Sequence, residues 1–190
     1  MIDFSFIEQL EGHSCTGYVP DPEGSNSGVT IASGFDIGAH TDADINLAFN
    51  KSLADKLRPY TGLKKQSAIQ ALEECPLELS EEEVSTIIAF SHDNARSRLE
   101  SAWDNFTQPD DADYPEILPE SFTDLPDTCQ TVIASVAFQY GYLPSRTPNF
   151  WRQVRCGQWE LALKNLRNFG DRYGTRRNKE ADLLEGWING

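Results

Sequence analysis

Two carboxylates and a hydroxyl stand out near the beginning of the chain: Glu11, Thr30 and Asp36. When two carboxyl groups are held on rigid elements, one can protonate a leaving oxygen while the other activates water or attacks a sugar carbon. A hydroxyl beside the second carboxylate could hold the attacking water while the aspartate draws its proton. These residue types therefore meet the minimum chemical need of glycoside hydrolysis.

The element that must position Thr30 and Asp36 is the segment 28–38, which the pattern predicts to be one extended strand. Successive side chains of a strand point to opposite faces. One face would be mostly apolar, and the other would carry small residues and one carboxylate, which suits a bulky polar ligand. Gly34 and Gly38 lie on that second face and leave room for a ligand near the backbone. Thr30 could be only a strand-favouring residue, whereas an aspartate in mid-strand needs a specific reason.

Glu11 is expected at the end of a short helix over about residues 3–11. Phe4, Ile7 and Leu10 would form the apolar stripe of this helix, and Gly12 occupies the helix-stopping position. Glu8 lies three residues before Glu11 and would share its helix face. It therefore competes with Glu11 for the role of acid.

This N-terminal run resembles the catalytic region of phage-type lysozymes, with the closest likeness to the subgroup of the pesticin lysozyme domain. The run comprises Glu11–Gly12, Gly17–Pro20 and Ser27–Gly38. Weaker pieces continue the likeness later in the chain, at Phe138–Gly141, Phe150–Trp151, Gly157, Trp159, Arg176–Arg177 and Glu180–Ala181. The likeness touches both ends of the chain and implies a lysozyme-like α+β fold.

The resemblance also implies roles for single residues. Glu11 matches the family's catalytic acid, Thr30 its catalytic threonine, and Asp36 its aspartate in the pesticin-like arrangement. In the better-known phage lysozymes the aspartate precedes the threonine, and Asp21 lies near that position, so Asp21 is the alternative second carboxylate.

Substrate contacts are implied for three further residues of the motif: Tyr18, Ser33 and Gly34. Tyr18 is the expected sugar-stacking ring because of its place in the motif.

Arg176 and Arg177 open the last expected helix, where positive charge is mildly unfavourable. The resemblance implies that one of them lies beside Glu11, as phage-type lysozymes place an arginine beside their acid. The alternative is an ion pair with Glu180 or with other acids of the surface.

The function implied by the resemblance is that of a muramidase acting on peptidoglycan glycan strands. Such an enzyme cleaves the β-1,4 bond between N-acetylmuramic acid and N-acetylglucosamine. The alternatives are a related glycosidase on chitin-like polymers, a lytic transglycosylase and a wall-binding module without catalysis. No cofactor is implied.

The residues that commonly bind metals show no metal-ligand spacing, so no metal is expected. The three histidines (His13, His40, His92) are scattered, and the four cysteines (Cys15, Cys75, Cys129, Cys156) form no Cys-x-x-Cys pair. Cys129 is expected to be a buried free thiol, with one or two disulfides as the alternative.

Charge is spread unevenly along the 190 residues, with a net −14 that divides into +3 for residues 151–190 and −17 for the rest. Such an acid-rich protein lacks the basic face that phosphate contacts need, so nucleic acid is excluded as a partner. The charge also opposes adsorption to an anionic wall, although net charge governs association rather than site chemistry. No run approaches the roughly 18 apolar residues of a membrane span.

The N-terminus carries an acidic residue where a secretory signal would carry Lys or Arg, so no cleavable signal is expected. A wall enzyme made in the cytoplasm would then need another route to the periplasm and wall of the target cell. We therefore expect an antibacterial toxin delivered by a secretion system, or a phage endolysin. A toxin would also need a cognate immunity protein as a partner.

Beyond residue 40 the pattern predicts helices only. Thr41 or Asp42 and Thr175 are predicted helix caps, and Ser80–Glu83 is a predicted capping box. The acidic, proline-bearing segment 109–119 is predicted to be a surface loop, and Cys129–Tyr140 a core helix. The sequence thus predicts one mostly α domain over residues 1–190, with a small β element at about residues 13–38.

Overall fold

The computed structural model describes residues 1–107 and 120–190. The loop predicted over 109–119 lies outside these residues. The chain forms two compact units: unit one is Met1–Leu10 with Asp93–Gly190, and unit two is Glu11–His92. One domain over residues 1–190 stays a prediction, because two compact units can be the lobes of a single domain.

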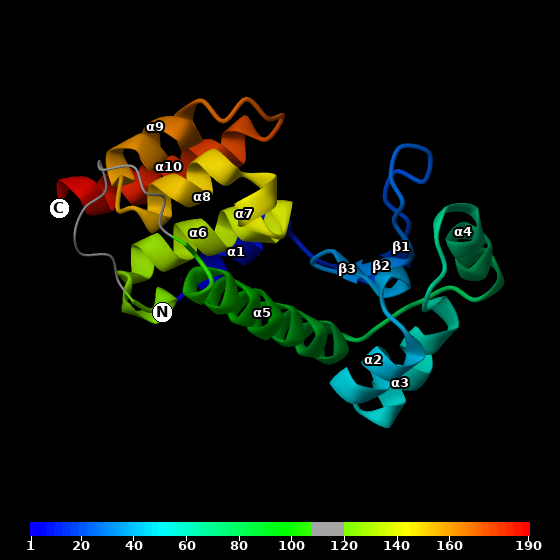
Figure 1. Cartoon of the computed structure of the whole chain (residues 1–190). Coiled ribbons are helices and arrows are strands. Elements are labelled where there is room, and N and C mark those ends of the chain that lie inside the picture. Colours follow the sequence, from blue (N-terminus) through cyan, green and yellow to red (C-terminus); the bar gives the residue numbers. More distant parts are fainter. Residues whose placement is uncertain (108–119) are drawn as a thin grey trace. The chain divides into compact units, whose positions relative to one another are not determined.

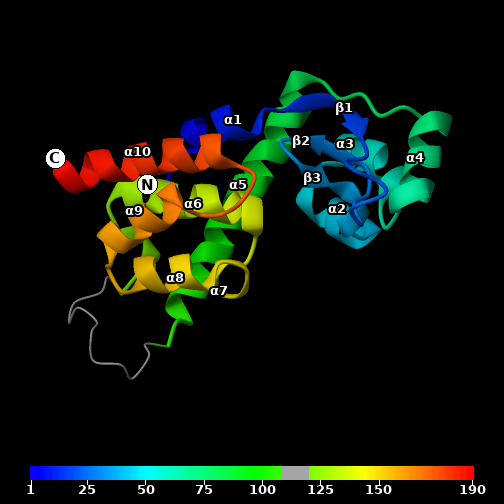
Figure 2. The ribbon, with the colours of Figure 1, turned by 90° about the horizontal axis from the view of Figure 1, so that it is seen from above.

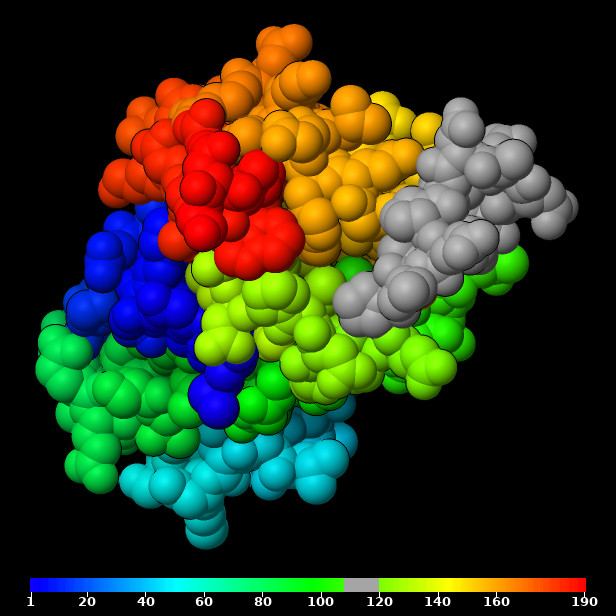
Figure 3. Space-filling view, turned by 90° about the vertical axis from the view of Figure 1, so that its left-hand side faces the viewer, coloured from blue at the N-terminus to red at the C-terminus, as the bar shows by residue number. Residues whose placement is uncertain are grey.

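Unit one is helical. It contains α1 (Phe4–Glu11, whose last residue belongs to unit two), the C-terminal part of α5 (Glu81–Asp104), α6 (Asp127–Tyr140), α7 (Leu143–Arg146), α8 (Pro148–Arg155), α9 (Trp159–Arg167) and α10 (Gly174–Asn189). Helix α10 packs against both α9 and α6, as Figures 1 and 2 show. The space-filling view of Figure 3 shows α10, in red, on the surface of this unit beside the orange residues of α9.

Helix α6 supplies much of the core of unit one, as its apolar sequence predicts. Every residue from Cys129 to Val136 is buried. In the same core the ring of Trp103 makes edge-to-face contacts with Phe122 and Trp151, at centroid distances of 5.7 and 5.8 Å. All four cysteines are free thiols in the structure, and burial raises the pKa of Cys129 to about 12.

Unit two combines a small sheet with short helices. The strands β1 (Ser14–Tyr18), β2 (Thr30–Ala32) and β3 (Phe35–Asp36) form an antiparallel sheet in the order β1-β2-β3. The helices are α2 (Asp42–Ala48), α3 (Lys51–Leu57), α4 (Lys65–Glu74) and the N-terminal part of α5, with 3-10 turns at Ile37–Ala39 and Arg58–Tyr60. A second core forms here, containing Val29, Ile31, Ile37, Leu53, Leu57 and Ile87.

The helix caps follow the sequence in two of three cases. Thr41 caps α2 through reciprocal hydrogen bonds with Asp44, and Ser80 and Glu83 form the same arrangement at the start of α5. Thr175 does not cap α10, because that helix begins at Gly174 and Thr175 lies inside its first turn. No helix in the two described ranges is long and apolar enough to cross a bilayer.

The segment 28–38 is a β-hairpin followed by a 3-10 turn, so the prediction of one unbroken strand is wrong. The chain reverses after β2, where Gly34 N–H donates to the carbonyl of Ile31 at 3.2 Å. Ala32 and Gly34 both have positive φ, at 54° and 99°, which bends the chain out of the extended region. The face expected to be open is also partly covered, since Thr30 and Ala32 are only 3% and 2% exposed.

Candidate active site

The hairpin places Thr30 and Asp36 directly opposite each other on β2 and β3. Tyr18, at the end of β1, is the partner of Thr30 on the other side. Directly opposed residues of an antiparallel sheet project from the same face, with Cβ atoms about 4.5–5.5 Å apart. Three residues singled out from the sequence therefore form one row across the sheet, in the order Tyr18, Thr30, Asp36.

Exposure differs along this row. Thr30 is buried, whereas the side chain of Asp36 is 28% exposed and Tyr18 is 41% exposed. The hydroxyl of Thr30 donates to the carbonyl of Gly28 at 3.3 Å, which leaves its oxygen lone pairs directed away from that bond. The carboxylate of Asp36 thus meets solvent beside a hydroxyl held in a fixed orientation.

Both oxygens of the Asp36 carboxylate have a donor. Gly28 N–H donates to Oδ1 at 3.1 Å, and Lys64 Nζ donates to Oδ2 at 2.9 Å. These bonds provide the specific reason for an aspartate at a strand position that disfavours it. Sequence reasoning missed Lys64, whose available signal was only its place just before the helix over 65–74.

Two glycines of the motif serve the packing of the chain against itself. A Cβ on Gly28 would lie 2.4 Å from the carbonyl oxygen of Leu63, and one on Gly38 would lie 2.1 Å from the same atom. The space predicted at Gly38 for a ligand is therefore taken by Leu63. The expectation of ligand room at Gly38 is wrong for this reason, whereas a Cβ on Gly34 would meet no atom within 4 Å.

Glu11 is the last residue of α1 and is exposed. Gly12 follows with φ of 67° and ends the helix, as the sequence predicts. Strand β1 begins at Ser14, which pairs with Ala32 of β2. The chain therefore runs from Glu11 directly into the sheet that carries Thr30 and Asp36. Glu8, the competitor of Glu11, is exposed on α1 as well.

Asp21 is an exposed turn residue with φ of 39°. Its Oδ1 accepts from Gly24 N–H at 3.0 Å, and its carbonyl accepts from Ser25 N–H at 2.8 Å. Aspartate is favoured in such turns because its side chain accepts from the backbone a few residues later. The turn alone accounts for the presence of Asp21.

The remaining residues implied for substrate contact lie in the turn between β2 and β3. Ser33 is half-buried and Gly34 is exposed. Within the described residues, no group of three or more His, Cys, Asp or Glu side chains is placed to hold a metal ion.

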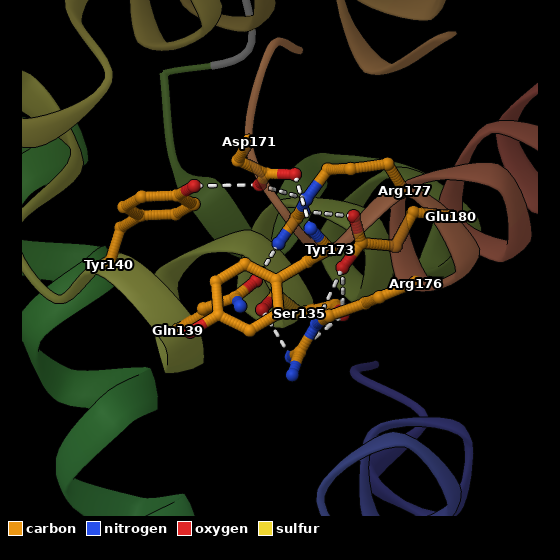
Figure 4. A network of polar contacts seen from close by, with 8 residues as sticks. All are labelled: Ser135, Gln139, Tyr140, Asp171, Tyr173, Arg176, Arg177 and Glu180. Carbon is orange, nitrogen blue, oxygen red and sulfur yellow. Dashed lines mark hydrogen bonds and ion pairs between the residues drawn. The ribbon is translucent and has the colours of Figure 1, made fainter. Parts of the chain in front are cut away.

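Arg176 and Arg177 belong to unit one, where they surround the buried carboxylate of Glu180 (Figure 4). Arg176 Nε donates to Glu180 Oε1 at 3.1 Å, and Arg177 forms an ion pair with the other oxygen. The alternative expectation, pairing with Glu180, is confirmed. A place beside Glu11 for either arginine stays a prediction.

The polar network around Glu180 also includes Ser135 and Asp171. Ser135 donates its hydroxyl to Glu180, and Arg177 also reaches Asp171, with 3.1 Å between Nε and Oδ2 (Figure 4). Burial raises the pKa of Glu180, against the opposing effect of the two arginines. Burial likewise favours a higher pKa for Asp171, but hydrogen bonds from Tyr140 and from the Tyr173 backbone, with the charge of Arg177, hold it below its usual range.

A comparison with protein families matches the chain to the pesticin family, described as a bacterial toxin homologue of phage lysozyme, C-terminal part. The match covers residues 1–160, which include Glu11, the sheet and Lys64 but end before Arg176 and Arg177. No curated protein matches the chain closely enough to count as a relative. The mostly α architecture with a small antiparallel sheet is the α+β, lysozyme-like fold that the sequence predicts. With most of its length matched, the chain belongs to the pesticin family of toxin domains homologous to phage lysozyme.

Proposed function

We propose that this protein is a muramidase that hydrolyses the β-1,4 bond between N-acetylmuramic acid and N-acetylglucosamine. The observation that carries the proposal is the row of Tyr18, Thr30 and Asp36 across the sheet that follows Glu11. It joins an exposed ring, a hydroxyl and a fixed carboxylate on one face. Membership of the lysozyme-homologous family supports a glycosidase rather than another hydrolase.

Glu11 is the proposed acid, which donates a proton to the leaving glycosidic oxygen. Asp36 is the proposed base, which takes a proton from water as the water attacks the sugar carbon. Thr30 lies beside Asp36 and orients this water through its hydroxyl oxygen. This mechanism inverts the anomeric centre, whereas direct attack by Asp36 would retain it.

Asp36 is favoured over Asp21 as the second carboxylate by what each side chain does. Asp21 closes a turn through Gly24, which is an ordinary structural use of aspartate. Asp36 stands opposite Thr30 and carries a backbone donor and an ammonium donor on its two oxygens. Such support is typical of a side chain that must be held in one geometry.

Tyr18 is the proposed sugar-stacking residue, since an exposed aromatic ring offers an apolar face to a pyranose. Ser33 and Gly34 are proposed to contact the glycan from the hairpin turn. The polymer itself is the proposed partner, and it requires neither metal nor cofactor in this mechanism.

The proposal is tested by Glu11→Gln, which keeps the size of the side chain and removes its acid. We expect loss of at least about 100-fold in the lysis of purified peptidoglycan, with unchanged circular dichroism. Glu8→Gln makes the same change three residues earlier on α1 and distinguishes the competing acid. Near-normal lysis by Glu11→Gln would contradict the assignment, and loss confined to Glu8→Gln would move the acid role to Glu8.

The products distinguish the alternative activities. A muramidase releases fragments with a reducing muramic acid end, whereas a lytic transglycosylase leaves an anhydro end whose mass is lower by one water. A glycosidase of chitin-like polymers would instead act on chitin oligomers. A wall-binding module would sediment with peptidoglycan and release no fragments.

We further propose that the protein acts as an antibacterial toxin in the periplasm and wall of a target cell. Its family is one of bacterial toxins. A producing cell would then require a cognate immunity protein, and co-expression with the neighbouring gene product should protect a host that exports the toxin to its periplasm. Unchanged killing in such a co-expression experiment would count against that partner.

A further inference from the structure

We propose that Lys64 is a positioning residue for Asp36: its ammonium group orients the carboxylate for the reaction. This inference rests on the proposed function and concerns the same site. Lys64 Nζ lies 2.9 Å from Asp36 Oδ2, and each side chain is 28% exposed. The pair is therefore partly shielded from solvent, unlike an ordinary surface ion pair.

Each oxygen of the Asp36 carboxylate accepts one hydrogen bond. Gly28 N–H donates to Oδ1, and Lys64 donates to Oδ2, so rotation of the carboxylate about its last bond would break at least one of these bonds. Each oxygen retains a further lone pair, since a carboxylate accepts at about four sites. One of these sites can take the proton of a water molecule without disturbing the two donors.

Lys64 is itself fixed by the backbone around it. Leu63, its predecessor, presents its carbonyl to Gly28 and Gly38. Lys65, its successor, donates its backbone N–H to the carbonyl of Ser27 at 3.0 Å.

The start of α4 anchors Lys64 from the other side. The hydroxyl of Ser67 donates to the Lys64 carbonyl at 2.7 Å, and Lys64 N–H donates to that hydroxyl oxygen at 3.2 Å. Lys65 adopts φ of 48°, an unusual conformation for a lysine that sharply turns the chain at this point. The backbone therefore delivers the ammonium of Lys64 to Asp36 along a defined path.

Lys64 lies 28 residues after Asp36 in the sequence, so the contact depends on the packing of its segment against the hairpin. Removal of the ammonium leaves Oδ2 of Asp36 without its fixed donor and frees the carboxylate to rotate. Misplacement of a reacting group by about 1 Å can reduce a rate by about 100-fold. Substrate binding should change little, because Lys64 is proposed to act on Asp36 and not on the glycan.

The experiment compares Lys64→Met and Lys64→Arg with a matched control, Lys65→Met, in which the neighbouring exposed lysine is changed. Activity is measured on soluble peptidoglycan fragments. For Lys64→Met we expect kcat to fall by about 10- to 100-fold with KM within about threefold of the original value. Lys64→Arg should recover part of kcat, and Lys65→Met should retain it.

The decisive comparison repeats Lys64→Met in the Asp36→Asn background. A residue that acts through Asp36 should have little further effect once the carboxylate is gone. An equal fold-loss from Lys64→Met in both backgrounds would overturn the proposal, as would a rise in KM with kcat unchanged. Thermal unfolding gives a second test on the original protein, Lys64→Met, Asp36→Asn and the double variant. The loss of Tm in the double variant should be smaller than the sum of the losses in the two single variants. Fully additive losses would contradict an interaction between Lys64 and Asp36.

The two proposals fail in different ways. If Asp36→Asn keeps full activity, the assignment of Asp36 and the proposed mechanism are overturned. If Asp36→Asn is inactive while Lys64→Met is fully active, only the role of Lys64 is overturned.

Discussion

Thr30 and Asp36 lie opposite each other on β2 and β3, where Thr30 is 3% exposed and the side chain of Asp36 is 28% exposed. The buried threonine is held by the carbonyl of Gly28, while the carboxylate is held by the N–H of the same residue. Gly28 thus links the orientations of the two side chains that are proposed to bind and activate water.

The two candidate aspartates should differ in their effect on activity. Asp36→Asn is expected to lower kcat/KM by at least about 100-fold, because an amide cannot accept the proton of water. Asp21→Asn should lower it by less than about 10-fold, since asparagine tolerates the positive φ of Asp21 and can still accept from Gly24. Kinetics on soluble wall fragments would test this order, and the reverse ranking would place the base at Asp21.

A methyl group at Gly28 should damage both fold and activity. In Gly28→Ala the new Cβ would meet the Leu63 carbonyl at 2.4 Å and the Asp36 carboxylate at 2.8 Å. We expect a loss of about 1–3 kcal/mol in the free energy of unfolding, together with reduced kcat. Gly186→Ala in α10 is the matched control, because its Cβ would meet nothing within 4 Å. That control should be neutral or stabilising by up to about 1 kcal/mol, and equal effects of the two substitutions would contradict the packing argument.

The buried carboxylate of Glu180 should be among the most sensitive positions for stability. Among the described residues, Glu180→Gln removes one of the two carboxylates that pair with the guanidinium of Arg177, which is 2% exposed, and leaves only Asp171. Breaking one side of a buried ion pair is expected to reduce the free energy of unfolding by about 3–5 kcal/mol. Glu185→Gln removes a carboxylate from the exposed pair with Arg167 and should change it by less than about 1 kcal/mol. Urea unfolding of both variants provides the test, and similar losses would contradict it.

Asp171 should make the stability of the protein depend on acid pH. Its pKa in the folded state is lowered below the ordinary 3.8, so the folded state binds fewer protons there than the unfolded state. The stabilisation by Asp171 is therefore present above the unfolded pKa and is lost as the pH falls through the folded pKa. In Asp171→Asn we expect lower stability at neutral pH and a difference from the original protein that shrinks below pH 3.8. A difference that stays constant over the acid range would exclude this role.

Local features of the fold follow from the sequence alone. The cap at Thr41, the capping box at Ser80 and the helix end at Gly12 depend on side chains within a few residues, so their patterns are visible in the sequence. The core helix α6 is visible for the same reason, as a run of apolar residues with few interruptions. Glu11, Thr30, Asp36 and Tyr18 were visible through the family motif, which is itself a local pattern, whereas Lys64 lies outside that motif.

The neighbourhood of Thr30 and Asp36 depends on the tertiary structure. In an unbroken strand, six residues would separate the two side chains by about 20 Å, too far for both to contact one water molecule. The hairpin brings them opposite each other instead. A strand that turns back on itself keeps the same alternation of apolar and polar residues as an unbroken strand, so this alternation does not reveal the turn. The positive φ of Ala32 gives no signal either, because alanine rarely adopts it.

The partners of the charged side chains likewise depend on the tertiary structure. Lys64 reaches Asp36, and Ser135 reaches Glu180, only because separate segments pack together. Individual ion pairs have no periodicity along the chain, and each acid has many possible partners in a protein with 30 acidic residues. The sequence by itself therefore determines the local elements and the chemical groups of the site. The folded backbone decides which of those groups meet, because burial and hydrogen-bond geometry select one partner among many.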